Sequence, residues 1–135
     1  MKRAIMVVDD EEEICDLLQD FLTREGYQVY TATNGMEAIS SAEQNELDLA
    51  LLDLKMPGMD GIEVLKRMKW IAPDCPVIMI SGHATISTAM AAVKLGAFDF
   101  IEKSYWETNI THLHGPYGLK QREDKYHDGN IKGNT

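Results

Sequence analysis

The chain has 135 residues, of which 44% are hydrophobic, and a net charge of −9. This length is typical of one domain with a sizeable core, and the acidic balance argues against binding to a nucleic acid backbone. No run of eighteen apolar residues is present, and the N-terminal apolar run is too short for a signal peptide, so we expect a cytoplasmic protein that does not span a membrane.

The first 103 residues alternate between strand-like and helix-like segments. Short apolar runs bounded by turn residues predict strands over 4–8, 28–32, 47–52, 77–80 and 97–101. Apolar residues at helical spacing predict an inner face on the first helix, followed by helices over 36–44, 61–69 and 84–94; the face comprises Ile14, Leu17, Leu18, Phe21 and Leu22. This alternation predicts an α/β fold with a doubly wound, five-stranded parallel sheet.

The alternation stops after Lys103. Residues 1–103 hold 9 Lys and Arg against 18 Asp and Glu, whereas residues 104–135 hold 4 of each and show no helical or strand period. A fifth helix is therefore not recognisable, and we expect a domain over 1–103 and an atypical tail over 104–135. The two cysteines, Cys15 and Cys75, lack the spacing of a metal site and are expected to be small packing residues.

Polar residues recur where the predicted strands end. Asp9 and Asp10 follow the first strand, Asp53 the third, Ser81 the fourth and Lys103 the fifth. In a parallel sheet these positions share the edge at which ligands bind. Each residue also has a plainer interpretation, as helix N-terminal charge, a turn or cap residue, or a solvated surface lysine.

Three carboxylates at one edge would repel one another, and a hard divalent cation would relieve that repulsion. A few protein oxygens with room for water suit Mg²⁺ better than a Ca²⁺ cage. A carboxylate beside Mg²⁺ can act as a nucleophile and form an aspartyl phosphate, with a lysine and a hydroxyl near the phosphoryl oxygens.

The motifs at these positions resemble the receiver domain of two-component response regulators. They are V-V-D-D at 7–10, L-L-D-L-K-M-P-G-M-D-G at 51–61, V-I-M-I-S-G-H at 77–83 and K-L-G-A-F-D-F-I-E-K at 94–103. Two segments, G-H-A-T-I-S-T-A at 82–89 and G-A-F-D-F-I-E-K at 96–103, are similar to receivers of the nitrogen-regulation type. The resemblance implies a flavodoxin-like fold with strand order 2-1-3-4-5.

The resemblance also implies a role for each site residue. Asp53 would accept a phosphoryl group from a histidine kinase or phosphotransfer protein. Asp10, Asp53 and the Lys55 backbone carbonyl would bind Mg²⁺ directly, with Asp9 acting through water. Ser81 and Lys103 would bind the phosphoryl oxygens. Phe100 would be the aromatic switch residue that turns inward when Ser81 moves.

The implied protein is a signalling switch that controls an output such as transcription, without being an enzyme, and a second copy of the chain is a further option as partner. Two departures stand out: Ser104 occupies the position where the family has proline, and the usual fifth helix is not recognisable. Two other functions compete with this interpretation. A haloacid dehalogenase-type phosphatase would carry its nucleophile after the first strand with a second Asp two residues on, whereas here Lys55 stands two residues after Asp53 and the acidic pair comes first. A flavin-binding flavodoxin would carry a loop of Ser, Thr and Gly after the first strand, whereas the acidic run 9–13 would repel a phosphate there.

Overall fold

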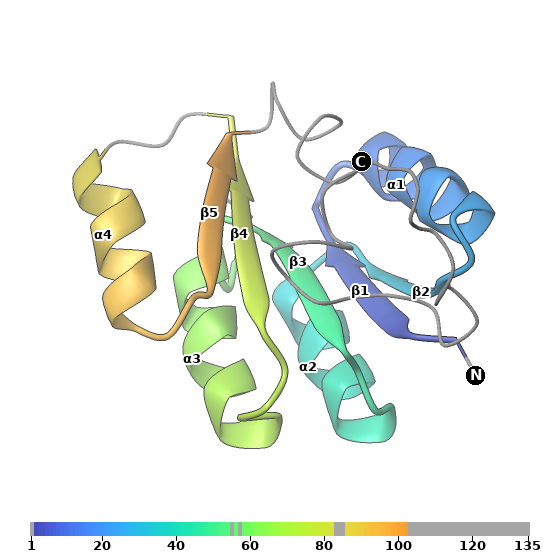
Figure 1. Cartoon of the computed structure of the whole chain (residues 1–135). Coiled ribbons are helices and arrows are strands. Elements are labelled where there is room, and N and C mark those ends of the chain that lie inside the picture. Colours follow the sequence, from blue (N-terminus) through green and yellow to red (C-terminus); the bar gives the residue numbers. More distant parts are fainter. Residues whose placement is uncertain (1, 55, 57, 83–85, 103–135) are drawn as a thin grey trace, which may run out of the picture.

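The computed structural model describes residues 2–54, 56, 58–82 and 86–102. Strands and helices alternate along them (Figure 1). The strands are β1 (Ala4–Val8), β2 (Gln28–Ala32), β3 (Leu49–Asp53), β4 (Val77–Ser81) and β5 (Asp99–Glu102). The helices are α1 (Glu12–Arg24), α2 (Gly35–Gln44), α3 (Gly61–Ile71) and α4 (Ile86–Lys94). The tail over 104–135, and with it the predicted division at residue 103, lies outside the described residues.

The five strands form one parallel sheet in the order β2-β1-β3-β4-β5, which confirms the predicted fold class. Val8 at the end of β1 is paired with Leu52 of β3 and with Ala32 of β2. The carboxyl ends of β1 and β3 are therefore neighbours. Connections leave β1 toward one side and β3 toward the other, which opens a crevice at this edge.

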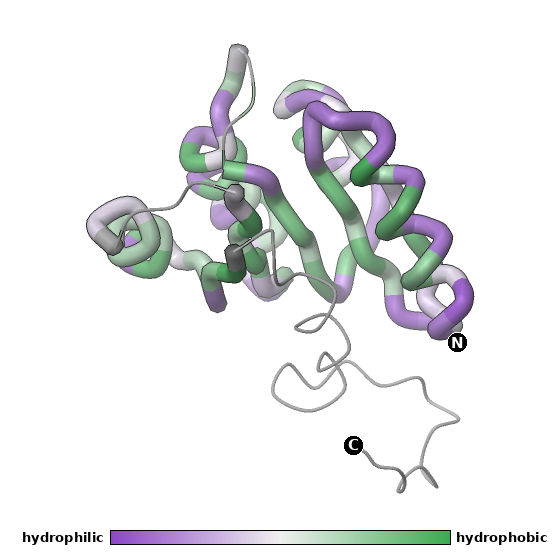
Figure 2. The backbone as a smooth tube through the Cα atoms, turned by 90° about the horizontal axis from the view of Figure 1, so that it is seen from above, coloured by the Kyte–Doolittle hydropathy of each residue, from purple (hydrophilic) through white to green (hydrophobic). Residues whose placement is uncertain are grey.

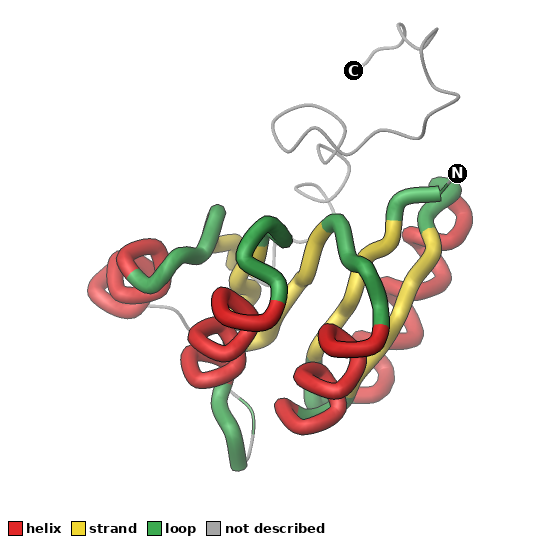
Figure 3. Tube along the Cα trace, turned by 90° about the horizontal axis from the view of Figure 1, so that it is seen from below, coloured by secondary structure: helices red, strands yellow, loops and turns green. Residues whose placement is uncertain are grey.

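Helices cover both faces of the sheet (Figure 3). One hydrophobic core joins α1 to sheet residues such as Val7 and Leu51, and the other joins α2, α3 and Ala92 of α4 to residues such as Val8 and Leu52. Adjacent residues of a strand face opposite sides, so a strand buried on both faces must be apolar throughout. Figure 2 shows this as hydrophobic strand segments enclosed by helices of mixed hydropathy.

The inner face of α1 differs from the sequence prediction at Leu17, which is half exposed. The fully buried positions are Cys15, Leu18 and Leu22, while Ile14 and Phe21 are partly buried. With 3.6 residues per turn, Leu17 lies about 160° around the helix from Cys15. The small thiol, rather than the larger leucine, faces the sheet.

Several element ends shift by one or two residues from their predicted positions. The observed β3 begins at Leu49 and includes Asp53, and β4 includes Ser81, because both polar residues are paired in the parallel ladder. A prediction from hydropathy ends a strand at the first polar residue, whereas backbone pairing extends the observed strand to include that residue. Gly26 has φ 97°, a left-handed conformation that suits a residue just after the end of α1.

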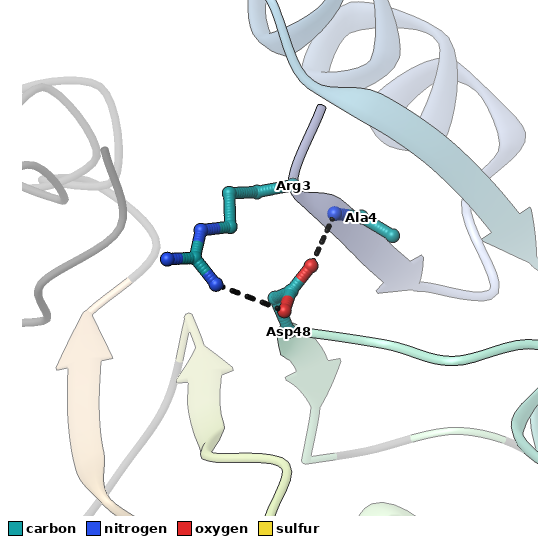
Figure 4. Close-up of polar contacts among 3 residues, drawn as sticks. All are labelled: Arg3, Ala4 and Asp48. Atoms are coloured by element: carbon teal, nitrogen blue, oxygen red, sulfur yellow. Dashed lines mark hydrogen bonds and ion pairs between the residues drawn. The ribbon is translucent and has the colours of Figure 1, made fainter. Parts of the chain in front are cut away.

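At the opposite edge of the sheet, Asp48 joins the beginnings of β1 and β3 (Figure 4). Its carboxylate accepts a hydrogen bond from the Ala4 amide at 2.7 Å and pairs with Arg3 at 3.4 Å. The Asp48 amide donates to the Ala4 carbonyl at 2.8 Å. These contacts help to set the β1–β3 register, on which the positions at the far ends of both strands depend.

Candidate functional site

Three carboxylates meet where β1 and β3 end. Asp9 follows β1 and is 3% exposed, Asp53 is the last residue of β3 and is 5% exposed, and Asp10 is exposed. Each offers a carboxylate oxygen, and these oxygens lie within 4.8 Å of one another. The structure thus brings together the three aspartates that the sequence analysis singled out.

Asp9 is held on several sides. Its Oδ1 accepts a hydrogen bond from the Glu11 amide at 2.9 Å, and its own amide donates to the Ala32 carbonyl at 3.1 Å. The Cys15 thiol donates to the Asp9 carbonyl at 3.3 Å. A buried carboxylate constrained in this way is positioned before any ligand arrives.

Burial raises the pKa of the Cys15 thiol to about 11, and the nearby Asp9 carboxylate adds to the effect. The thiol therefore stays protonated at neutral pH and acts as a hydrogen-bond donor rather than a nucleophile. Its burial confirms the prediction that it packs in the core. Its contact with Asp9 was not predicted from the sequence, where the available signal is the position of Cys15 beside Ile14 on the inner side of α1.

Asp53 is placed by the sheet and by the turn that follows it. It is paired with Ile80 in the β3–β4 ladder, and the next residue, Leu54, donates its amide to the Ile80 carbonyl at 3.0 Å. The chain then returns so that the Gly61 amide donates to the Leu54 carbonyl at 2.9 Å. Asp60 caps α3 by accepting from the Glu63 amide at 3.0 Å, which fixes where this return ends.

Ser81 is 2% exposed and is paired with Glu102. It directly follows Ile80, the residue that pairs with Asp53. Phe100 is half buried, is paired with Met79 and packs against the core shared with α2 and α3. Lys55 and Lys103, the other predicted site residues, lie outside the described residues. The structure therefore places five of the predicted side chains at or near the carboxyl edge of the sheet.

The space beneath the two buried carboxylates is a small cavity of about 10 Å³ between the sheet and α1. Asp9 and Asp53 line it together with apolar side chains: Val7, Val8, Ile14, Leu18, Leu51 and Ile80. At about one water molecule in size, it cannot hold a substrate. A ligand of the carboxylates therefore has to approach from the outer side, where Asp10 is exposed.

The donor set fits a magnesium ion. Carboxylate oxygens are the ligands that Mg²⁺ prefers, and it is usually bound by one or two carboxylates with several waters retained. Two of the three carboxylates are buried and the third is exposed, which leaves one side of the cluster open to water.

Comparison with known proteins identifies this arrangement. The family model of the response regulator receiver domain matches residues 5–114. The chain belongs to the response regulator receiver family. It is 39% identical over 105 residues to sporulation initiation phosphotransferase F of Bacillus subtilis, covering 78% of this chain and 85% of that protein. It is 42% identical over 107 residues to the nitrogen assimilation regulatory protein NtrX of Azorhizobium caulinodans, covering 78% of this chain and 24% of that protein.

Solved receiver structures agree with the fold. The receiver domain of NtrX from Brucella abortus superposes with a TM-score of 0.75 at 38% identity, covering 82% of this chain and 93% of that one. A response regulator protein from Burkholderia pseudomallei with a phosphorylated aspartic acid has a TM-score of 0.79 at 28% identity, covering 89% and 68%. The chain spans about a fifth of the transcriptional regulatory protein ZraR of Klebsiella oxytoca, to which it is 40% identical.

Membership confirms the predicted family and its nitrogen-regulation-type character, and it makes this chain a phosphoacceptor of two-component signalling. Receiver domains act with histidine kinases or phosphotransfer proteins. Neither the phosphatase nor the flavodoxin alternative is supported. One buried carboxylate follows β1 and the other ends β3, an arrangement that neither alternative predicts. Within the described residues no helix is long and apolar enough to cross a bilayer.

Proposed function

We propose that Asp53 is the phosphoacceptor of this receiver and that Asp9, Asp10 and Asp53 hold a Mg²⁺ ion. The observation that carries the proposal is the cluster of three carboxylates within 4.8 Å at the β1–β3 crevice. The family resemblance adds the Lys55 backbone carbonyl as a further ligand. Bound there, Mg²⁺ would neutralise charge on the carboxylates and on the transferred phosphoryl group.

Asp53 is the member of the cluster best placed to react. It is the last residue of β3, the strand between β1 and β4, and its backbone is paired with Ile80 of β4. In the transfer, a carboxylate oxygen of Asp53 bonds to phosphorus while the bond from phosphorus to the histidine nitrogen of the donor breaks. The products are an aspartyl phosphate and a free histidine side chain on the donor.

Ser81 and Lys103 would then bind the phosphoryl oxygens. Ser81 ends the strand beside β3, on the side of the sheet that also carries β5 and Phe100. A shift of the Ser81 hydroxyl toward the phosphoryl group would give Phe100 room to move inward. Phe100 is half buried and lies on β5, the strand next to the one that Ser81 ends. This position supports its role as a switch residue.

The domain would extend over residues 1–103, and residues 104–135 would form an atypical tail. The output would be regulation of transcription through a partner or a further module, because the acidic domain itself is unsuited to a nucleic acid backbone. A sensor histidine kinase or phosphotransfer protein is the proposed phosphoryl donor, and a second copy of the chain is an additional candidate partner. The domain would act as a cytoplasmic switch and not as an enzyme with turnover of a separate substrate.

Phosphorylation by acetyl phosphate tests the assignment. The full chain should gain the mass of one phosphoryl group in the presence of Mg²⁺, and peptide mapping should place it on Asp53. Asp53→Asn should abolish the gain. Asp10→Asn should weaken Mg²⁺ binding in an NMR titration, whereas Asp16→Asn, which removes an exposed carboxylate of α1 outside the cluster, should leave it unchanged. Phosphorylation of Asp53→Asn at the parent level would contradict the proposal.

A further inference from the structure

We propose that Cys15 is a positioning residue for the magnesium ligands, because its thiol orients the peptide bond that joins Asp9 to Asp10. This inference rests on the proposed metal site. It assigns to a core residue of α1 a task at the sheet edge, carried by hydrogen bonds to the backbone and not by contact with the ion.

The thiol contacts two carbonyl oxygens, each at the end of a different strand. Cys15 Sγ donates to the Asp9 carbonyl at 3.3 Å and lies 3.6 Å from the Ala32 carbonyl at the end of β2. The Ala32 carbonyl also accepts the Asp9 amide at 3.1 Å. Cys15, Asp9 and Ala32 therefore form a closed set of contacts that ties α1 to the ends of both strands.

The peptide carbonyl of Asp9 belongs to the same rigid plane as the Asp10 amide nitrogen. A donor on that carbonyl thus limits rotation of the peptide that separates the two acidic residues. The Asp9 side chain is restrained separately, since its Oδ1 accepts the Glu11 amide. The thiol contact bears on where the exposed Asp10 carboxylate points relative to the buried Asp9.

Burial makes this contact matter. Cys15 is 2% exposed, so water cannot readily replace the thiol as a donor to the Asp9 carbonyl. A side chain without a donor at position 15 would leave that carbonyl with less hydrogen bonding, and the peptide would gain freedom to tilt. Residues that orient metal ligands from outside the coordination shell commonly change metal affinity when they are replaced.

Cys75 provides a matched control within the same chain. It is also buried, at 3% exposure, and its thiol lies 3.6 Å from a carbonyl oxygen, that of Pro76. It precedes β4 and therefore lies at the opposite edge of the sheet from the carboxylates. Removing either sulfur costs core packing, but only the Cys15 change touches the acidic cluster.

The test compares Mg²⁺ titrations of the ¹⁵N-labelled full chain for the parent, Cys15→Ala, Cys15→Ser and Cys75→Ala. Cys15→Ala should weaken Mg²⁺ binding about tenfold, the lower end of the range for outer-shell partners, while Cys75→Ala should bind as the parent does. Cys15→Ser restores a donor and should restore most of the affinity. Without metal, the Asp10 amide nitrogen resonance should move in Cys15→Ala and stay in place in Cys75→Ala.

Melting temperatures of all variants separate positioning from packing, because both alanine variants should lose stability. If Cys15→Ala does not fold, Cys15→Val, which fills the site with a somewhat larger side chain without a donor, takes its place beside Cys15→Ser. Equal Mg²⁺ affinity in the Cys15 non-donor variant and Cys75→Ala would overturn the inference. A parent chain that binds no Mg²⁺ would instead overturn the proposed metal site, a distinct outcome.

Discussion

Gly61 lies against the backbone of Asp53, so closely that a Cβ atom on Gly61 would be 2.2 Å from the Asp53 carbonyl oxygen. It would also be 2.8 Å from the Leu54 Cα. The first turn of α3 therefore contacts the end of β3 directly. The absence of a side chain at position 61 is what allows the chain to return beneath the proposed phosphoacceptor.

We expect Gly61→Ala to destabilise the fold by about 2–4 kcal/mol, because the atoms that the new methyl group would meet are backbone atoms that cannot rotate away. Asp53 should be displaced with them, so phosphorylation by acetyl phosphate should be lost even where the variant is folded. Urea unfolding and the phosphorylation assay measure the two effects.

Gly58→Ala is the matched control for this prediction. Gly58 has φ 80° but nothing lies within 4 Å of a Cβ at this position. Its replacement should cost about 1 kcal/mol of left-handed backbone strain. Equal loss of stability in the two variants would show that Gly61 matters only as a flexible residue and not as a point of close approach.

Asp53→Asn should leave the protein as stable as the parent or stabilise it by up to about 1 kcal/mol in the absence of Mg²⁺. The change removes one of three negative charges that lie within 4.8 Å of one another and keeps nearly the same side-chain shape. Thermal unfolding with and without Mg²⁺ measures it. A clear fall in melting temperature without metal would mean that favourable interactions of the Asp53 charge in the fold outweigh its repulsion by Asp9 and Asp10.

The Asp48 contacts at the far edge give a prediction about stability alone. Asp48→Ala should cost about 2 kcal/mol, because the Ala4 amide loses a charged acceptor at 2.7 Å. Arg3→Ala should cost less than about 0.5 kcal/mol, because the Arg3–Asp48 ion pair is partly exposed to solvent. Chemical denaturation of the two variants checks the ranking. A larger loss for Arg3→Ala would assign the stabilisation to the ion pair instead of the backbone contact.

Stability should fall at alkaline pH through the two buried thiols. Burial raises the pKa of Cys15 and of Cys75 from the ordinary value of 9.0 to about 11. Above pH 9.0 the unfolded chain releases these protons while the folded chain keeps them. The contribution of each neutral thiol is therefore complete below the unfolded pKa and is lost as the pH rises from 9.0 through about 11.

Urea unfolding between about pH 8 and about pH 10.5 measures this dependence, and the parent should be compared with Cys15→Ser and Cys75→Ser. Each serine variant removes one titrating thiol and should flatten the pH profile, while the titration of other groups remains in all three proteins. Parallel profiles would show that the thiols do not contribute to the alkaline loss.

The elements themselves and the identity of the site residues followed from local patterns in the chain. Apolar runs ended by turn residues placed five strands, and helical spacing placed the helices between them, because period and turn chemistry are properties of neighbouring residues. Asp9, Asp10 and Asp53 could be identified as a set, since each follows an apolar run and the motifs around them resemble receivers. The polar ends of β3 and β4 were missed because strand pairing, not hydropathy, extends them.

The tertiary structure decided which residues pack against one another. The order that makes β1 and β3 neighbours brings the three carboxylates within 4.8 Å, and this order depends on contacts between residues far apart in the chain. The same contacts turn Cys15 inward and Leu17 outward on α1, and they press Gly61 against Asp53. Such relationships depend on which surfaces pack together, whereas periodicity describes only one element at a time.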